Sequence, residues 1–441
     1  MSRIGNRRRR ASIHTLGCRL NQSEAQLIRD RLEEDGYDVV PFGDDAEVGI
    51  INTCTVTNLA DAKCRNTIRG FIRKNPQAFT AVVGCYSQMG DKAIAEIPGV
   101  DLIIGNQDKL SVLDYVEFGK NETPVIVRDR IDKRDFSIHF AGDAPCNQRA
   151  NLKVQDGCDF MCSFCIIPFA RGRARARNFG NLLDEARSLV RRGVRELVMT
   201  GVNIGTYESG GKDLLSIVDS LNAIPGLDRI RISSIEPTTI PEELFALMND
   251  PQHALLPFLH IPLQSGCDRT LQRMRRKYSI AEYLDFLQKA HETINDLYLG
   301  TDIMVGFPGE SEEDFEESCC VFRENPFAFC HVFSFSEREG TPAARATGSV
   351  SVPERARRSA FLRRLSLSRR HDYYAAHIGR TLRVLFENPK QELWPGYTDN
   401  YIRVVVAAKN LPDSGMDLAN KTARVRLDRI SADFVEGTVV E

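Results

Sequence analysis

The sequence predicts an α/β protein with an N-terminal open parallel α/β sheet domain, a central partial (βα)6 barrel and a small C-terminal β-barrel. Three observations support this fold class. The chain has 441 residues, which is enough for about three domains. Strand and helix patterns alternate along its first two thirds, as is typical of parallel sheets. The last part contains short β-branched runs separated by turn residues, which favours a small barrel.

The first part of the chain places a cysteine after each of three expected strands. We expect strands at 11–16, 48–51 and 80–83, and helices at 21–34 and 59–74. Cys18, Cys54 and Cys85 follow these strands. Because the carboxyl ends of parallel strands meet at one edge of a sheet, three thiols far apart in sequence are expected to converge there. Coincidence is the alternative, and Cys64, inside the second helix, is expected to be a buried apolar residue.

Changes in composition divide the chain into five segments. These are a basic arm at 1–11, an N-terminal α/β domain at 12–131, a linker at 132–143, the barrel domain at 144–375 and the C-terminal β-barrel at 376–441. The barrel strands are expected at 152–154, 196–199, 229–235, 258–261, 298–303 and 328–335, with helices at 182–192, 280–294 and 352–370. The C-terminal strands are expected at 381–386, 401–406 and 422–427, with turns at Pro395-Gly396 and Asp413-Ser414-Gly415.

Composition and charge limit the class of protein. The apolar fraction is 42% and the charged fraction 27%, which are ordinary values for a soluble globular chain. No apolar run is long enough for a transmembrane helix, and no apolar stretch follows the basic start, so we expect a cytoplasmic protein with no membrane partner. Twelve cysteines in such a chain indicate metal binding or catalysis rather than disulfides.

Basic residues are clustered although the net charge is only −2. One cluster occupies alternate positions, at Arg171, Arg173, Arg175 and Arg177. A local basic stripe can bind nucleic acid even when the total charge is close to zero. A solvated surface is the alternative interpretation for any one of these stripes.

A second set of cysteines follows the first expected barrel strand. Cys158, Cys162 and Cys165 have the spacing C-x3-C-x2-C. This spacing places three thiolates on one loop, where they suit a compact iron–sulfur cluster. Three local ligands leave one iron open for a bound molecule. Zinc is the alternative, but it requires a fourth Cys or His that the loop does not offer.

This loop and its surroundings resemble the radical S-adenosylmethionine (SAM) enzymes, and in particular their methylthiotransferase branch. The similar stretches are 158–177, 259–266, 273–277 and 302–310, and the resemblance extends from about residue 12 to the end of the chain. It implies that the open iron binds the amino and carboxylate groups of SAM. One electron then cleaves SAM to methionine and a 5′-deoxyadenosyl radical.

The same resemblance gives the N-terminal cysteines a role. It implies that Cys18, Cys54 and Cys85 hold a second cluster, whose open iron carries the sulfur that becomes a methylthio group. The implied cofactors are two [4Fe-4S] clusters and SAM, with two SAM molecules used per product. The C-terminal barrel resembles a TRAM domain, which is an RNA-binding module. An electron donor such as flavodoxin or ferredoxin and a sulfur source are implied as further partners.

The stretches 17–22, 155–159 and 233–237 indicate the substrate by resemblance. They are most similar to the group that modifies carbon 2 of N6-threonylcarbamoyladenosine at position 37, in the anticodon loop of tRNA. The alternatives are isopentenyladenosine in tRNA, a ribosomal protein or, more distantly, a non-catalytic RNA-binding protein with structural metal. Adenine carbon 2 has a strong C–H bond that no side-chain base usefully breaks, so a cofactor radical is needed. The clusters are expected to face each other across the base, with the N-terminal domain over the barrel mouth.

Further site residues are expected around the cysteine loop. Candidates for SAM binding follow expected barrel strands, at Gly201, Asn203, Ser234, Glu236 and Gln264. Hydrogen bonding within loops is the alternative for each. Phe160 resembles the aromatic position that packs near the SAM adenine in this superfamily. The arginines from Arg171 to Arg177 lie beside the loop, and we expect them to hold anticodon phosphates in a salt-dependent way.

Overall fold

The computed structural model describes residues 8–116, 120–140, 148–413 and 416–440. The chain forms two compact units. The first comprises Met1–Ala144, Lys153–Asn181 and Ser336–Ala344, and the second comprises Pro145–Leu152, Leu182–Phe335 and Arg345–Glu441. The C-x3-C-x2-C loop therefore lies in the first unit, although it falls within the expected 144–375 domain. Most of the basic arm, and residues 141–143 of the expected linker, lie outside the described residues.

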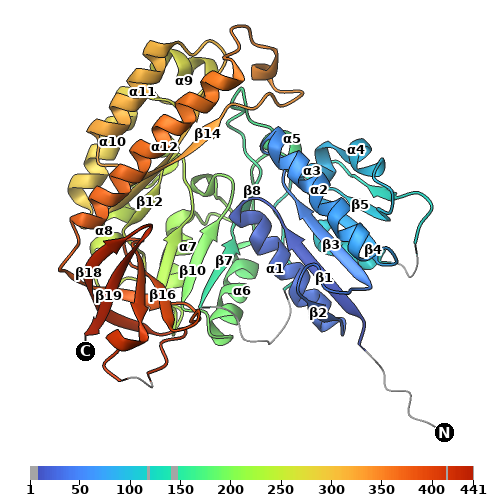
Figure 1. Cartoon of the computed structure of the whole chain (residues 1–441), viewed down its shortest axis with the longest axis horizontal. Helices are drawn as coiled ribbons and strands as arrows, with labels where there is room; N and C mark the ends of the chain where they lie inside the picture. The colour runs from blue at the N-terminus through green and yellow to red at the C-terminus, as the bar shows by residue number, and fades with distance from the viewer. Residues whose placement is uncertain (1–7, 117–119, 141–147, 414–415, 441) are drawn as a thin grey trace. The chain divides into compact units, whose positions relative to one another are not determined.

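A six-stranded parallel sheet forms the centre of the first unit, in the order β2-β1-β3-β4-β5-β6 (Figure 1). The strands are β1 (Arg10–Thr15), β2 (Asp38–Val40), β3 (Val48–Thr53), β4 (Phe79–Gly84), β5 (Leu102–Ile104) and β6 (Val125–Val127). The predicted open parallel sheet is confirmed, and its three predicted strands correspond to β1, β3 and β4. The other three strands have three residues each, which is too short to show a sequence pattern.

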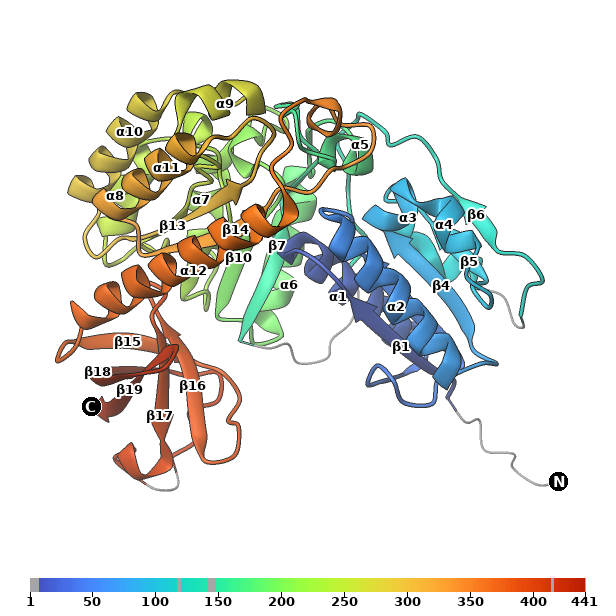
Figure 2. The ribbon, with the colours of Figure 1, turned by 45° about the horizontal axis from the view of Figure 1, so that its top comes forward.

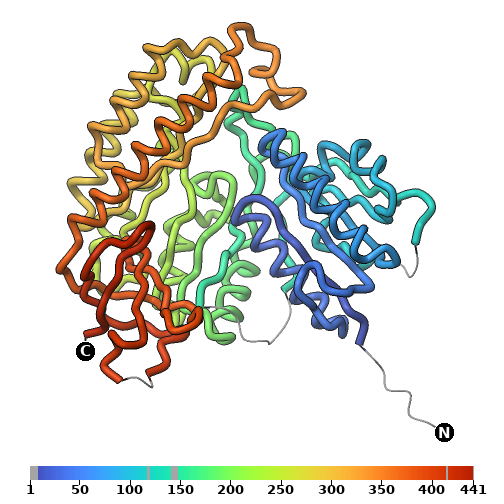
Figure 3. The backbone as a smooth tube through the Cα atoms, in the orientation of Figure 1, coloured from blue at the N-terminus to red at the C-terminus, as the bar shows by residue number. Residues whose placement is uncertain are grey.

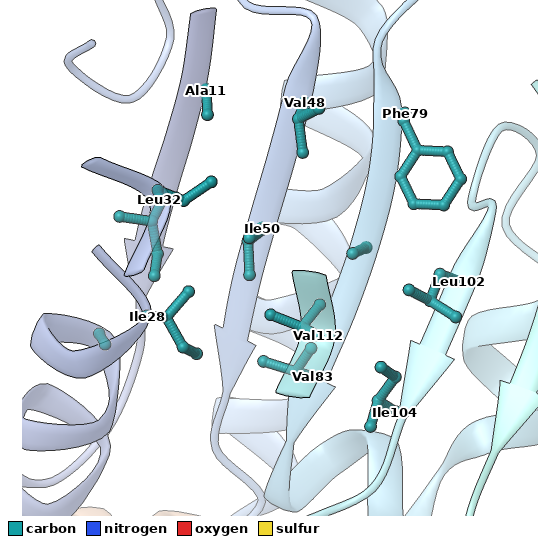
Figure 4. Close-up of a cluster of buried hydrophobic side chains, with 13 residues drawn as sticks. Ala11, Ile28, Leu32, Val48, Ile50, Phe79, Val83, Leu102, Ile104 and Val112 are labelled. Atoms are coloured by element: carbon teal, nitrogen blue, oxygen red, sulfur yellow. The ribbon is translucent and has the colours of Figure 1, made fainter. Parts of the chain in front are cut away.

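Helices cover both faces of this sheet. They are α1 (Arg19–Glu34), α2 (Asn58–Lys74), α3 (Cys85–Met89), α4 (Asp91–Ala95) and the 3-10 helix η1 (Lys109–Tyr115). Ile28 of α1 and Val112 of η1 pack on one face with Ile50 (Figure 4). Ile68 and Phe71 of α2 pack on the other face. Strands β3 and β4 are buried at every position, as expected for central strands covered on both sides.

Two three-stranded sheets form a partial barrel in the second unit. Their orders are β11-β10-β7 and β12-β13-β14. A parallel bridge from Ile230 to Leu255 joins them. The strands are β7 (Arg149–Lys153), β10 (Glu196–Thr200), β11 (Arg229–Ile232), β12 (Phe258–His260), β13 (Tyr298–Val305) and β14 (Phe329–Ser334). All six predicted strands are present, although β7 begins, and β11 ends, three residues earlier than predicted.

Helices alternate with these strands. They are α6 (Phe179–Arg191), α7 (Leu214–Asn222), α8 (Glu243–Asn249), α9 (Asp268–Met274), α10 (Ile280–Thr293), α11 (Glu312–Glu324) and α12 (Val352–Ala375). The predicted helices at 182–192, 280–294 and 352–370 correspond to α6, α10 and α12. The long helix α12, orange in Figure 3, packs against β14, where the Ser366 hydroxyl donates to the Cys330 carbonyl at 2.8 Å. Within the described residues, no helix is both long and apolar enough to cross a membrane.

The C-terminal part is a closed five-stranded barrel in the order β15-β16-β17-β19-β18, red in Figure 2. Its strands are β15 (Thr381–Phe386), β16 (Leu393–Thr398), β17 (Arg403–Ala407), β18 (Thr422–Ser431) and β19 (Phe434–Val440). The small C-terminal barrel is confirmed, but the turn predicted at Pro395-Gly396 is wrong, because both residues lie inside β16. A Cβ at Gly396 would lie 2.6 Å from the Leu385 carbonyl oxygen, so glycine permits a close strand approach there. Residues 414–415 of the other predicted turn lie outside the described residues.

Buried charges join the two barrels of the second unit. Arg231 donates to Glu196 at 2.8 Å, and Arg229 pairs with Asp399 of the C-terminal barrel at 2.8 Å. Burial acts to raise the pKa of Glu196, but the charges of Arg231 and Arg229 lower it to about 2. The carboxylate therefore stays ionised, and the arginines are compensated without access to water.

Candidate active site

The three N-terminal cysteines lie at one edge of the parallel sheet. Strands β1, β3 and β4 are neighbours, with Thr15 beside Asn52 and Thr53 beside Gly84. Cys18 caps the start of α1, Cys54 directly follows β3, and Cys85 begins α3. The structure thus brings these thiols together from positions 67 residues apart, as the strand pattern predicts.

Close backbone packing holds the first two cysteine loops together. Gly17 has a φ of +104°, and a Cβ at this position would lie 2.6 Å from the Cys54 Cβ and 2.9 Å from its sulfur. Only glycine fits both the left-handed backbone and this contact. The Asn21 side chain donates to the carbonyls of Leu16 and Thr53, at 2.8 and 2.9 Å, and so connects the two loops.

The environment of Cys54 suits a thiolate that ligates a cation. Burial, together with the neighbouring Cys85 and Cys18 sulfurs, raises the pKa of the Cys54 thiol to about 12. Three ionised thiols at this edge would repel one another without a compensating positive charge. Metal ligation supplies that charge and deprotonates the thiols, so the donor set fits an iron–sulfur cluster.

The C-x3-C-x2-C loop is held by its own backbone. Cys158 accepts a hydrogen bond at its sulfur from the Phe160 N–H, at 3.4 Å, and the Cys165 N–H donates to the Cys162 carbonyl at 3.0 Å. Gly157 has a φ of +71°, and a Cβ there would lie 2.0 Å from the Arg173 carbonyl oxygen. The sulfur-directed N–H and the tight turn suit three thiolates that share one cluster.

A buried arginine joins the elements that carry the two cysteine sets. Helix α5 (Ile167–Arg171) follows Cys165 and packs against α3, which begins at Cys85. The Arg171 guanidinium donates to both Glu24 carboxylate oxygens at 3.0 Å and to Asp156 at 3.1 Å. Burial acts to raise the pKa of Glu24, but Arg171, Lys109 and Lys153 hold it well below its ordinary value. All these groups belong to the first unit.

Two lysines and a second arginine complete this group. We call it the buried charge cluster, and its members are Glu24, Lys109, Lys153, Asp156, Arg171 and Arg175. Lys153 donates to Glu24 at 2.8 Å and to Asp156. Lys109 pairs with Glu24 and donates to the Asn106 side-chain oxygen at 2.7 Å. That same oxygen lies 4.0 Å from the Cys85 sulfur. The cluster therefore reaches the N-terminal cysteine set.

Three of the four predicted RNA-binding arginines point into the protein. Arg171, Arg175 and Arg177 are buried, with 1%, 8% and 0% of their surface exposed. Arg175 pairs with Asp156 at 3.7 Å, and Arg177 donates to the Asn181 side chain at 2.8 Å. This placement contradicts the expectation that these three residues hold phosphates, because their guanidinium groups already have protein partners. The alternate spacing was misleading, because the four arginines do not share one strand: Arg171 ends α5, and only Arg175 lies in β9 (Arg175–Ala176).

The predicted SAM residues of the second unit lie after β10, β11 and β12, at the strand ends where they were expected. Asn203 accepts from the Thr239 hydroxyl at 3.1 Å. Glu236 pairs with Arg276; burial raises the pKa of Glu236 although the arginine lowers it. Gln264 has a φ of +68° and donates through its backbone to Asp302 at 2.7 Å. Gly201 and Ser234 are half-buried. Phe160 lies in the first unit, on the cysteine loop.

Sequence reasoning did not identify several residues that position the cysteines. Besides Asn21, Glu24 and Lys109, these include Arg338, which donates to the Thr55 hydroxyl at 2.6 Å and to Asp61 at 2.7 Å, next to Cys54. Glu24 lies on the buried side of α1, where a carboxylate interrupts the apolar pattern. That interruption is the signal that could have identified it, because buried carboxylates require partners.

Comparisons with known proteins show the family of the chain. The Radical SAM superfamily model matches residues 152–319, and the model described as Uncharacterized protein family UPF0004 matches residues 10–105. A solved cobalamin- and [4Fe-4S]-bound radical S-adenosylmethionine methyltransferase, TsrM from Kitasatospora setae, has a TM-score of 0.51 at 15% identity. The alignment covers 76% of this chain and 77% of that one. The barrel and its cysteine loop therefore have a radical SAM fold.

Curated relatives cover almost the whole chain. Threonylcarbamoyladenosine tRNA methylthiotransferase MtaB of Bacillus subtilis is 37% identical over 97% of this chain and 96% of its own length. MtaB of Aquifex aeolicus is 34% identical over 90% and 96%. The tRNA-2-methylthio-N(6)-dimethylallyladenosine synthase of Jannaschia sp. is 32% identical over 86% and 83%. The chain belongs to the radical SAM methylthiotransferases and is MtaB-like. The cofactors of this family are iron–sulfur clusters and SAM.

The contact between Gly17 and Cys54 gives a first prediction. Gly17→Ala should displace Cys54 and reduce the iron bound after anaerobic reconstitution by about half, because one of the two expected clusters would be lost. Gly36→Ala is the matched control: Gly36 also has a positive φ, +84°, but its Cβ would meet nothing within 4 Å. Both variants carry similar backbone strain, so equal iron contents in the two would contradict the assigned role of Gly17.

Proposed function

We propose that this chain methylthiolates carbon 2 of N6-threonylcarbamoyladenosine at position 37 of tRNA, using two [4Fe-4S] clusters and two SAM molecules. The observation that carries the proposal is the pair of cysteine triads within one compact unit, at a sheet edge and on a C-x3-C-x2-C loop. In the product, carbon 2 has exchanged its hydrogen for a methylthio group. When bound, the clusters and SAM supply the sulfur, the methyl group and the carbon radical that this C–H bond requires.

The chain's own residues would hold and orient these groups. Cys18, Cys54 and Cys85 would ligate one cluster, and Cys158, Cys162 and Cys165 the other. The tight turns at Gly17 and Gly157 fix the backbone of the two sets. The candidates for SAM binding are Gly201, Asn203, Ser234, Glu236 and Gln264 at the strand ends of the second unit, and Phe160 on the cysteine loop of the first. The ion pair with Arg276 orients the Glu236 carboxylate and opposes the rise in its pKa that burial causes.

The relatives favour threonylcarbamoyladenosine over the other substrates. The MtaB relatives are 31–37% identical to this chain, and the dimethylallyladenosine synthases are 30–32% identical. Isopentenyladenosine in tRNA is therefore the second candidate. The proposed site of action is the cytoplasm, with a flavodoxin- or ferredoxin-like electron donor and a separate sulfur source.

Arg173 remains the candidate for phosphate contact among the four predicted arginines. Its side chain is 51% exposed, and its pairing with Asp159, at 3.4 Å, is loose. It lines a pocket of the first unit together with Arg130, Lys133 and the exposed Phe169. Cations beside an exposed ring suit an unpaired RNA segment, since phosphates bind the charges and bases stack on rings. The closed barrel β15–β19 would add RNA contacts in the manner of a TRAM domain.

The assignment of the cysteine loop is tested by removing its thiols. The combined variant Cys158→Ala, Cys162→Ala and Cys165→Ala should keep about half of the iron and produce no 5′-deoxyadenosine from SAM. Iron is measured after anaerobic reconstitution, and 5′-deoxyadenosine by chromatography. Cys320→Ala, which removes another half-buried thiol, is the control and should retain both. Continued SAM cleavage by the triple variant would overturn the proposed function.

The role of Arg173 is tested by tRNA affinity at several salt concentrations. Arg173→Gln should weaken binding and reduce the slope of log K against log salt by about 1, because one phosphate contact is lost. Arg187→Gln is matched to it, since Arg187 is 52% exposed and also pairs with an exposed aspartate, Asp184 at 3.1 Å. If both variants reduce the slope equally, or neither does, Arg173 does not bind phosphate.

A further inference from the structure

The buried charge cluster contains more positive than negative groups. Its cations are Lys109, Lys153, Arg171 and Arg175, and its carboxylates are Glu24 and Asp156. In the described part of the chain, every ion pair of these four cations goes to one of these two carboxylates. Arg338, which lies near Cys54, differs from these four cations because it pairs with a carboxylate outside the cluster, Asp61. Four cations thus share two carboxylates in a region that excludes water.

Such an excess of buried charge requires compensation. Isolated buried cations are costly, and a buried charge without a partner destabilises a fold strongly. Lys109 and Arg171 have 1% of their side-chain surface exposed, so solvent ions cannot neutralise them. Burial and the Arg171 charge lower the pKa of Lys109, and the negative charges of Glu24 and the Cys85 sulfur oppose this. A negative group in contact with the cluster would remove the imbalance.

The nearest feature of the site that can supply this negative charge is the sulfur set at Cys85. The Asn106 side-chain oxygen lies 4.0 Å from the Cys85 sulfur and accepts from Lys109 at 2.7 Å. The Asn106 amide nitrogen donates to the Ala170 carbonyl at 2.6 Å, beside Arg171. Burial acts to lower the pKa of Arg171, but negative charge on Cys85, Glu24 and Asp156 raises it well above its ordinary value. Lys109 and Arg171 therefore both lie close enough to the N-terminal triad to interact with its charge.

We propose that Lys109 and Arg171, supported by Lys153 and Arg175, are the electrostatic counterpart of the cluster at Cys18, Cys54 and Cys85, and set its reduction potential. The proposal rests on the proposed function, which places a cluster there. A cubane cluster with three thiolate ligands carries net negative charge, and that charge increases by one when it accepts an electron. Nearby buried cations favour the reduced form, because charges interact strongly where water is excluded. Lys109 and Arg171 would thus act on the charge of the cluster and would not contact the substrate.

The test measures the reduction potential of this cluster alone. The full-length chain with Cys158, Cys162 and Cys165 changed to alanine provides the background, and the potential is titrated with dithionite and redox mediators. Lys109→Met should reduce the ratio of reduced to oxidised cluster at a fixed solution potential by at least about tenfold, or about 59 mV for one electron. The potential is read from the loaded fraction, so it does not depend on the yield of reconstitution.

Lys120→Met is the matched control. Lys120 also pairs with a fully buried carboxylate, Asp101, at 2.8 Å, but Asp101 precedes β5 and so lies at the opposite edge of the same sheet. This control should leave the potential unchanged. Arg171→Lys, which keeps the charge, should remain close to the parent, whereas Arg171→Gln should lower the potential as Lys109→Met does. If Lys109→Met does not fold, Lys109→Gln, which retains a hydrogen-bond donor towards Glu24, takes its place.

The outcomes separate this proposal from the proposed function. A background chain that binds no iron would overturn the assignment of the N-terminal triad, and the electrostatic proposal with it. A background chain that binds a cluster whose potential is the same in Lys109→Met and Lys120→Met would overturn the electrostatic proposal alone. A lowered potential in Lys109→Met and Arg171→Gln, with Lys120→Met and Arg171→Lys unchanged, would support it.

Discussion

The contact of the Arg171 guanidinium with the Glu24 carboxylate is the interaction on which the candidate active site depends. Glu24 lies on the helix that starts after Cys18, and Arg171 ends the helix that follows Cys165. Two hydrogen bonds of 3.0 Å join them, and both side chains are buried. Removing either partner would leave a charge buried and unpaired, at a cost of about 3–5 kcal/mol. This is a long-range contact, because Glu24 and Arg171 are 147 positions apart in the sequence.

This constraint explains why the C-x3-C-x2-C loop belongs to the same compact unit as the N-terminal sheet. In sequence, the loop follows the first strand of the barrel. In the structure, Asp156 before the loop and Arg171 after it both join the charges of Glu24, Lys109 and Lys153. The elements that carry the two cysteine triads therefore share one buried set of charges. A site that brings two cofactors to one base benefits from this arrangement, because small displacements of reacting groups reduce rates strongly.

The fold and the cysteine sets could be predicted from sequence because both depend on local patterns. Strand runs such as Val48–Thr53 and Phe79–Gly84 are mostly apolar, and each is followed at once by a cysteine. The buried charge cluster could not be predicted in this way, since it joins residues of α1, η1, β7, β8 (Gln155–Asp156), α5 and β9, and no sequence pattern connects them. The same reason accounts for the arginines. Arg175 and Arg177 appear as a basic stripe in sequence, and only their partners Asp156 and Asn181 show that they point inward.

The proposed reaction is tested most directly by nucleoside mass spectrometry of tRNA from a strain that lacks this gene. We expect loss of the 2-methylthio form of threonylcarbamoyladenosine, with its unmodified precursor accumulating and the methylthio forms of isopentenyladenosine unchanged. The wild-type gene should restore the lost nucleoside, and a gene encoding Cys54→Ala should not. Persistence of methylthio-threonylcarbamoyladenosine in the deletion strain, or loss of the isopentenyl form in its place, would contradict the account.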